Sequence, residues 1–71
     1  MATDVNVPMV GKIVAVNVKV GDQVQENDQV ATLEAMKMEM PIVAPVTGTV
    51  NQVNVKAGDD VTSDSVLMVI E

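Results

Sequence analysis

The sequence predicts an all-β domain, a flattened β-barrel or sandwich of two small antiparallel sheets with an internal two-fold quasi-symmetry. Two observations support this fold class. Valine is the commonest apolar residue and Phe, Tyr and Trp are absent, and β-branched side chains favour strands over helices. In addition, one segment of the chain occurs twice. The 71 residues suffice for a single domain, which we place at residues 1–71.

The repeat relates residues 8–34 to residues 45–71, which align without a gap at an offset of 37. Ten of the 27 aligned positions are identical and only three of the ten are valine, so a valine-rich composition does not explain the match. Because a stacked array usually needs at least about three copies, two copies related by a two-fold rotation are the simpler arrangement. The identical pairs are Pro8/Pro45, Gly11/Gly48, Val16/Val53, Asn17/Asn54, Val18/Val55, Lys19/Lys56, Gly21/Gly58, Asp22/Asp59, Val24/Val61 and Glu34/Glu71.

Each copy is expected to begin with a bend and to continue into a strand. Pro8–Gly11 and Pro45–Gly48 supply the bends. From residue 14 to residue 20 every second residue is valine, and this period of two predicts a half-buried strand. In the second copy Val53 and Val55 show the same alternation.

Two turns and a closing strand complete each copy. Gly21-Asp22 and Gly58-Asp59 form the first turn, because glycine accepts positive φ and aspartate bonds nearby backbone amides. The second turn falls at residues 27–28 and 64–65. Residues 30–33 and 66–70 are nearly continuous apolar runs, which suit strands in a core.

The segment EAMKMEM, residues 34–40, connects the two copies. By the offset, Lys37 is equivalent to positions just beyond both ends of the sequence, so a two-fold axis would place it at the pole opposite residues 1 and 71. A lysine at a hairpin tip is usually solvated and methionines usually fill gaps in a core, so these residue types alone favour a structural role. Met36 and Met38 flank the tip, however, and cannot both be well buried there. Their position indicates a surface that meets a partner.

Charge and composition exclude several other functions. The net charge of −6 opposes binding to nucleic acid and to anionic membranes. No apolar stretch approaches the roughly 18 residues of a membrane span and no basic leader precedes an apolar run, so we expect a cytoplasmic, monomeric domain. Histidine and cysteine are absent, and the acidic segment 58–65 lacks the spacing of a calcium loop. We therefore expect neither catalytic residues nor a metal site.

The segment EAMKMEM, with GDQV before it and APVTG after it, closely resembles the attachment hairpin of the biotinyl (biotin carboxyl carrier) domains, the sister family of the lipoyl domains. The resemblance covers essentially the whole chain and implies a barrel-sandwich hybrid fold. It implies that Lys37 is amide-linked to biotin by a biotin protein ligase that uses biotinyl-adenylate. Ala35, Met36, Met38 and Glu39 would form the surface that the ligase recognises, and the two methionines would select biotin over lipoate.

Three features depart from the pattern of that family. Asn27 and Asp64 stand where glycine is common, although both residue types tolerate left-handed backbone better than most. No insertion corresponds to the protruding thumb of some bacterial acetyl-CoA carboxylase carriers. Pro41 lacks an amide donor, so it should lie at an edge or at an unpaired position of a sheet.

The resemblance implies a carrier and not an autonomous enzyme. It implies that biotin on Lys37 takes a carboxyl group from a biotin carboxylase to a carboxyltransferase or a decarboxylase, while the domain contributes proximity. The alternatives are a lipoyl-type acyl carrier and an unmodified barrel that acts as a binding module. The acceptor stays open, because acetyl-CoA, propionyl-CoA, pyruvate and other substrates all use this kind of module.

Overall fold

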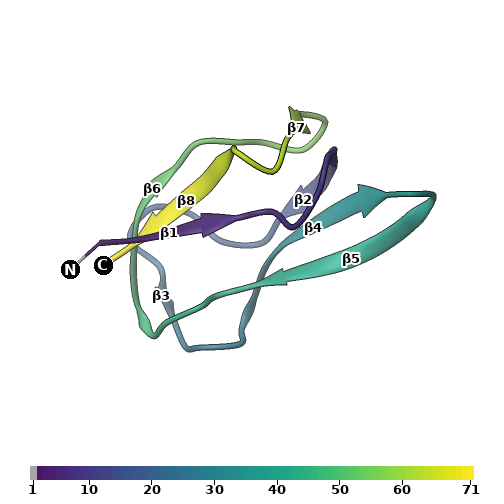
Figure 1. Cartoon of the computed structure of the whole chain (residues 1–71). Helices are drawn as coiled ribbons and strands as arrows, with labels where there is room; N and C mark the ends of the chain where they lie inside the picture. Colours follow the sequence, from purple (N-terminus) through teal and green to yellow (C-terminus); the bar gives the residue numbers. More distant parts are fainter. Residues whose placement is uncertain (1) are drawn as a thin grey trace.

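The computed structural model describes residues 2–71, and these form eight β-strands in two antiparallel sheets (Figure 1). The strands are β1 (Thr3–Asn6), β2 (Gly11–Val16), β3 (Gln23–Val24), β4 (Gln29–Ala35), β5 (Met38–Val43), β6 (Gly48–Val53), β7 (Asp60–Val61) and β8 (Val66–Ile70). One sheet has the strand order β1-β8-β6-β3 and the other has the order β5-β4-β2-β7. This arrangement confirms the predicted all-β sandwich. The described range contains no helix, and so none that could cross a membrane.

The two copies of the repeat are interlocked and do not form one sheet each. Strands β6 and β7 have the same bounds as β2 and β3 when 37 is added to the residue numbers of the first copy. The starts of β4 and β8 are related in the same way. Strand β3 of the first copy pairs with β6 of the second, and β7 of the second copy pairs with β2 of the first. Each copy thus completes the sheet of the other, so neither half contains a whole sheet.

Strand β1 is an element that the sequence analysis missed. Its pairing with β8 is equivalent to the pairing of β5 with β4. Val5 pairs with Met68, and their counterparts at the offset of 37, Ile42 and Ala31, pair with each other as well. Residues 3–6 share no identity with their counterparts at 40–43, so an alignment based on identities begins only at Pro8. The structural repeat is therefore longer than the repeat visible in the sequence.

A β-bulge in β2 changes which side chains face the core. The register between β2 and β4 shifts between residues 13 and 15, and a bulge reverses the alternation of the strand that contains it. Ile13 is fully buried, whereas Val14 is 40% exposed. The prediction of one alternating strand over residues 14–20 is therefore wrong, because β2 ends at residue 16. Val16 and Val18 do pack against the core, but Val20 is exposed beside the next turn.

The core is shared between the two copies. Ile13 and Leu33 are fully buried in the first copy, and their counterparts at the offset of 37, Val50 and Ile70, are buried in the second. The closing strand of the first copy is longer than predicted, residues 29–35 in place of 30–33, whereas that of the second copy spans residues 66–70 as predicted. The longer β4 brings the core residue Ala35 up to the connection between the copies.

The first turn of each copy has the predicted chemistry. Gly21 and Gly58 adopt φ values of 97° and 96°, and the carboxylate of the aspartate that follows accepts a hydrogen bond of 2.9 Å from the amide three residues before it in both copies. The second turns differ from one another. Asn27 adopts a left-handed φ of 77°, and Asp64 does not adopt a positive φ.

The connection between β4 and β5 lies at one end of the molecule, and the start of β1 and the end of β8 lie at the other (Figure 1). This is the placement that the repeat predicts for Lys37 relative to residue 71. Residue 1, to which the same prediction applied, lies outside the described residues. The start of β1 and the end of β8 therefore lie at the end of the molecule opposite the tip.

Candidate functional site

Strands β4 and β5 form the hairpin that presents Lys37. Ala35 pairs with Met38 at the end of the hairpin, so only Met36 and Lys37 remain in the turn. Their φ values are 54° and 64°, and two successive positive values indicate a type I′ turn, whose twist matches that of the paired strands. Asn and Gly usually occupy such turns, and other residues cost about 1–2 kcal/mol each in left-handed backbone. The turn therefore places Lys37 at the tip in a strained conformation.

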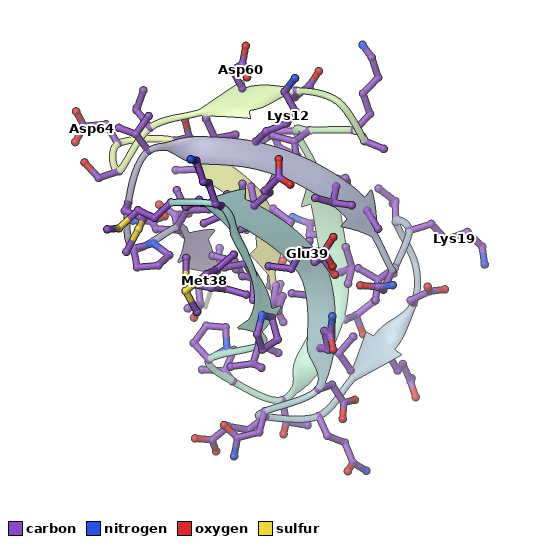
Figure 2. The ribbon with its side chains drawn as sticks, turned by 90° about the vertical axis from the view of Figure 1, so that its right-hand side faces the viewer. Lys12, Lys19, Met38, Glu39, Asp60 and Asp64 are labelled. Carbon is purple, nitrogen blue, oxygen red and sulfur yellow. The ribbon has the colours of Figure 1, made fainter. Side chains whose placement is uncertain are left out.

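Four of the five residues singled out from the sequence are exposed at this tip. The side chains of Met36 and Met38 are 82% and 65% exposed, and Lys37 and Glu39 are exposed as well. Figure 2, which faces the tip, shows Met38 and Glu39 towards different sides of the hairpin. Ala35 differs from the others, because its side chain is part of the core. Its burial leaves little of this residue for a partner to contact.

Gly11 allows β2 to approach the base of the hairpin closely. A Cβ atom on this residue would lie 2.5 Å from the carbonyl oxygen of Glu34 and 3.2 Å from the Cβ of Ala35. The first distance is shorter than any tolerable contact, so only glycine fits here without a shift of the backbone. This close approach brings the segment before β2 next to the turn.

The amine of Lys37 forms no ion pair with the part of the chain that the structure describes. Lys19 and Lys56 each form an ion pair with the aspartate three residues later, at 3.4 Å and 4.0 Å. Within residues 2–71, no carboxylate oxygen lies within 4.0 Å of the amine of Lys37 or Lys12. A reaction at the Lys37 amine would therefore break no ion pair in this part of the chain.

A shallow groove of about 520 Å³ lies beside the turn. Met36 and Lys37 line this groove, and so does Val10, which is 70% exposed. Lys12 and Asp60, which Figure 2 shows at the same end of the molecule, belong to its rim. We call this the tip groove; its lining consists of Val10, Gly11, Lys12, Glu34, Ala35, Met36, Lys37 and Asp60.

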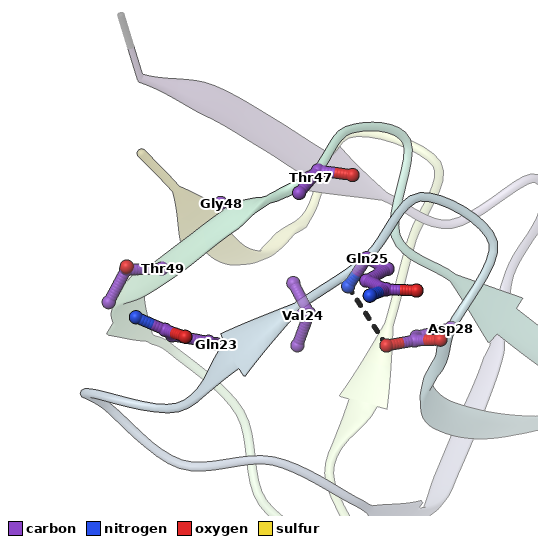
Figure 3. A pocket seen from close by; sticks show the side chains of 7 residues that line it. All are labelled: Gln23, Val24, Gln25, Asp28, Thr47, Gly48 and Thr49. Carbon is purple, nitrogen blue, oxygen red and sulfur yellow. Dashed lines mark hydrogen bonds between the residues drawn. The ribbon is translucent and has the colours of Figure 1, made fainter.

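A second groove of about 520 Å³ is lined by residues of β3, of the turn that follows it and of the start of β6 (Figure 3). We call it the distal groove; its lining consists of Gln23, Val24, Gln25, Asp28, Thr47, Gly48 and Thr49. The shift of 37 residues relates residues 10–12 of the tip groove to residues 47–49 of the distal groove, and it relates Asp60 to Gln23. The two grooves are therefore equivalent at these four positions, whereas residues 34–37 line the tip groove alone.

Lys37 and the residues that flank it were predicted from the sequence, whereas the left-handed turn and the groove beside it were not. The turn has no Asn-Gly signal, so no local pattern of residues indicated its backbone conformation. Val10 was missed because it lies in a bend and not in a recognisable motif. In the described part of the chain, no three His, Cys, Asp or Glu side chains gather closely enough to hold a metal ion.

Comparison with known proteins places this hairpin in a family. The family model described as "Biotin-requiring enzyme" matches residues 3–70, which include all the strands and the turn. The chain belongs to this biotin-requiring family. Membership makes it a small biotinyl carrier domain that is not itself catalytic, as the resemblance implied. Biotin is accordingly the cofactor that the family implies.

Individual relatives agree with this assignment. The chain is 52% identical over 40 residues to the biotin/lipoyl attachment protein of Bacillus subtilis, covering 56% of this chain and 55% of that protein. It is 62% identical over 68 residues to the 2-oxoglutarate carboxylase large subunit of Hydrogenobacter thermophilus, covering 96% of this chain and 10% of that subunit. The crystal structure of the Kluyveromyces lactis urea carboxylase matches with a TM-score of 0.92 and 32% identity, over 100% of this chain and 6% of that enzyme.

The matched region is therefore about half of the small bacterial protein and a minor part of the two large enzymes. The likeness concerns this module and not the catalytic parts of those enzymes.

Proposed function

We propose that the domain is a biotin carboxyl carrier in which an amide bond joins biotin to the side-chain amine of Lys37. The observation that carries the proposal is the placement of this lysine. It lies exposed in a two-residue turn, and its amine has no carboxylate partner within 4.0 Å among residues 2–71. A group attached at this point would extend away from the barrel, so the site fits a covalent cofactor.

The attachment step that we propose is an acyl transfer catalysed by a biotin protein ligase. The neutral amine of Lys37 attacks the carbonyl carbon of biotinyl-adenylate, the new C–N bond replaces the bond to the phosphate oxygen, AMP leaves, and the nitrogen loses a proton. Loss of one positive charge changes the net charge from −6 to −7. Met36, Met38 and Glu39 would form the surface that the ligase meets, and Ala35 would hold the turn in position.

Biotin, when bound, supplies a ring nitrogen that accepts a carboxyl group and later releases it. The contribution of the domain is to hold Lys37 at the end opposite the start of β1 and the end of β8 (Figure 1), so that a tether at either chain end leaves the tip free. Tethering through a short linker gives an effective concentration in roughly the millimolar range. The proposed partners are a biotin carboxylase and a carboxyltransferase or decarboxylase, and the names of the carboxylase relatives support this class.

The direct test is to incubate the domain with biotin, ATP and a purified biotin protein ligase, and then to measure its mass and map its peptides. We expect the mass to increase by that of one biotin residue, with the label on Lys37 and with Lys12, Lys19 and Lys56 unmodified. Lys37→Arg is the control, because arginine keeps the positive charge but cannot be acylated in this way. A label on another lysine, or a labelled Lys37→Arg variant, would refute the assignment.

A lipoyl-type carrier is separated from this proposal by the two methionines. The double variant Met36→Asp with Met38→Ala should keep its thermal midpoint, because both side chains are exposed, and it should be a poorer substrate for the biotin ligase. The physical reason is that docking of the ligase would desolvate the unpaired carboxylate of the aspartate at position 36, where the wild type presents the apolar thioether of Met36. We also expect lipoylation by a purified lipoate ligase to become detectable. Unchanged biotinylation kinetics in this variant would assign the selectivity to the turn geometry or to Glu39.

A further inference from the structure

The tip groove and the distal groove share part of their backbone framework but not their side chains. The shift of 37 residues relates residues 10–12 and Asp60 of the tip groove to residues 47–49 and Gln23 of the distal groove, so a residue that the fold itself requires at these positions should be needed in both. Gly11 and Gly48 meet this expectation, since a Cβ on either would lie within 3.0 Å of a backbone oxygen. The neighbouring positions do not, because Val10 and Lys12 are replaced by threonines in the distal groove.

Thr47 of the distal groove has a structural task that Val10 cannot perform. Its hydroxyl accepts a hydrogen bond of 3.0 Å from the amide of Glu26. The counterpart of Glu26 in the other copy is Ser63, and a valine side chain offers no acceptor to its amide. Val10 is instead 70% exposed next to Met36, which is 82% exposed. The tip groove thus lacks a turn hydrogen bond and carries an exposed apolar surface instead.

Charged side chains surround this apolar surface. Lys12 and Asp60 face each other in the register of β2 and β7, and their counterparts in the distal groove are the uncharged Thr49 and Gln23. Within residues 2–71, no ion pair shorter than 4.0 Å joins Lys12 to Asp60, so both charges are available to another molecule. An apolar centre with a charged rim is the usual composition of a recognition surface.

We propose that Val10 and Lys12 form a second recognition element for the biotin ligase, in the tip groove that Met36 and Lys37 also line. This inference rests on the proposed function, because it concerns the enzyme that modifies Lys37. The ligase is the partner that fits, since it has to enclose the amine of Lys37, and Lys37 lines the groove together with Val10.

The test exchanges Val10 for the residue at the equivalent position of the other copy. Val10→Thr keeps the shape of the side chain and adds a hydroxyl, and Val20→Thr is the matched control, because Val20 is a 60% exposed valine beside the β2–β3 turn. KM and kcat for biotin transfer are measured with the purified ligase and varied concentrations of domain. We expect Val10→Thr to raise KM about five-fold with little change in kcat, as loss of a binding contact does. Val20→Thr should stay within about two-fold of the wild-type KM.

Equal KM values for wild type, Val10→Thr and Val20→Thr, with wild type labelled on Lys37, would overturn this inference alone. Absence of label on the wild type would overturn the proposed function and the inference together. A third variant, Val10→Ile, keeps an apolar side chain and should retain the wild-type KM; a five-fold rise in this variant would overturn apolar recognition at position 10. Thermal midpoints of all variants report whether a change in KM reflects a change in folding.

Discussion

The two ends of the molecule are built from equivalent strand pairs. At the tip, β4 and β5 pair through Ile42 and Ala31, and at the other end β8 and β1 pair through the equivalent Val5 and Met68. Strands β5 and β1 both lie at the edges of their sheets. The two strand pairs differ in how their strands are connected. Two residues in left-handed backbone join β4 to β5, whereas β8 and β1 are far apart in the sequence and no such turn joins them.

The comparison shows that the sheets alone do not make the site. Duplication gives two equivalent strand pairs and two partly equivalent grooves, and within residues 2–71 only the end with the strained turn presents a lysine between exposed methionines. Core residues at equivalent positions should contribute equally to the free energy of unfolding. The exposed residues at the tip should contribute little to it. Variants at equivalent positions can test this division.

The largest effects should come from the shared core. Leu33→Ala and Ile70→Ala remove fully buried side chains at equivalent positions, and each should lower the free energy of unfolding by about 3 kcal/mol. That loss is a large fraction of the roughly 4–10 kcal/mol expected for a domain of this size. Urea unfolding followed by circular dichroism measures both values. A loss in one variant without a comparable loss in the other would show that the copies do not share the core equally.

The two close-approach glycines should give smaller and unequal effects. A Cβ at position 11 would lie 2.5 Å from the backbone oxygen of Glu34, whereas a Cβ at position 48 would lie 2.9 Å from that of Glu71. Glu34 lies within β4 and Glu71 follows the end of β8, so the backbone at Glu71 can shift more easily. We expect Gly11→Ala to lower the free energy of unfolding by about 2–3 kcal/mol and Gly48→Ala by about 1 kcal/mol. The reverse order in urea unfolding would contradict this account.

A substitution in the β4–β5 turn should raise the free energy of unfolding, whereas the substitutions in the core and at the glycines lower it. Met36→Gly removes the left-handed strain of about 1–2 kcal/mol and adds a glycine entropy cost of about 0.5–1 kcal/mol, so the variant should be more stable by about 0.5–1 kcal/mol. The control Met38→Gly lies in β5, outside the positive-φ region, and should be less stable by a similar amount. Differential scanning calorimetry should show shifts of a few degrees of opposite sign. A lower thermal midpoint for Met36→Gly would show that the turn is not strained.

The smallest effect should be a dependence on pH at the first turn. The hydrogen bond from the backbone amide of Lys19 lowers the pKa of Asp22 below its ordinary value of 3.8. Desolvation opposes this shift, and the side chain of Lys19 adds smaller contributions that lower the pKa. A lowered pKa in the folded state contributes stability above the unfolded-state pKa, and this contribution is lost as the pH falls through the folded-state value. Asp22→Asn should therefore be less stable than wild type at about pH 6, and the difference should shrink as the pH falls below about 4.

The matched variant for that prediction is Asp59→Asn in the other copy. Its ion pair with Lys56 is longer than that of Asp22 with Lys19, 4.0 Å against 3.4 Å, so we expect Asp59→Asn to lower the urea midpoint at about pH 6 by less than Asp22→Asn does. Urea midpoints between about pH 2 and pH 6 measure both variants. A difference between wild type and Asp22→Asn that is constant over this range would exclude a contribution from the charge of Asp22.

Much of the fold follows from the sequence, because the repeat gives strand positions in one copy from those in the other. Some features could not be predicted from the sequence, and each has a physical reason. Strand β1 shares no identity with its counterpart in β5, and the bulge at Val14 depends on strand pairing that no local pattern specifies. Lys37 and its neighbours were recognisable as a motif, whereas the exposure of Val10 follows only from its place beside the turn.

The interlocked strand order also affects how the domain folds. The β4–β5 hairpin joins neighbouring residues, whereas β1 and β8 bring Thr3 next to Ile70. Hairpins form in about 1–10 μs, and proteins with many distant pairings fold in about milliseconds to seconds. The tip can therefore form early, while β1 stays without a partner until β8 has been synthesised. An unpaired strand is open to intermolecular pairing during this interval, and the exposed Asp4 in β1 places a charge that opposes such aggregation.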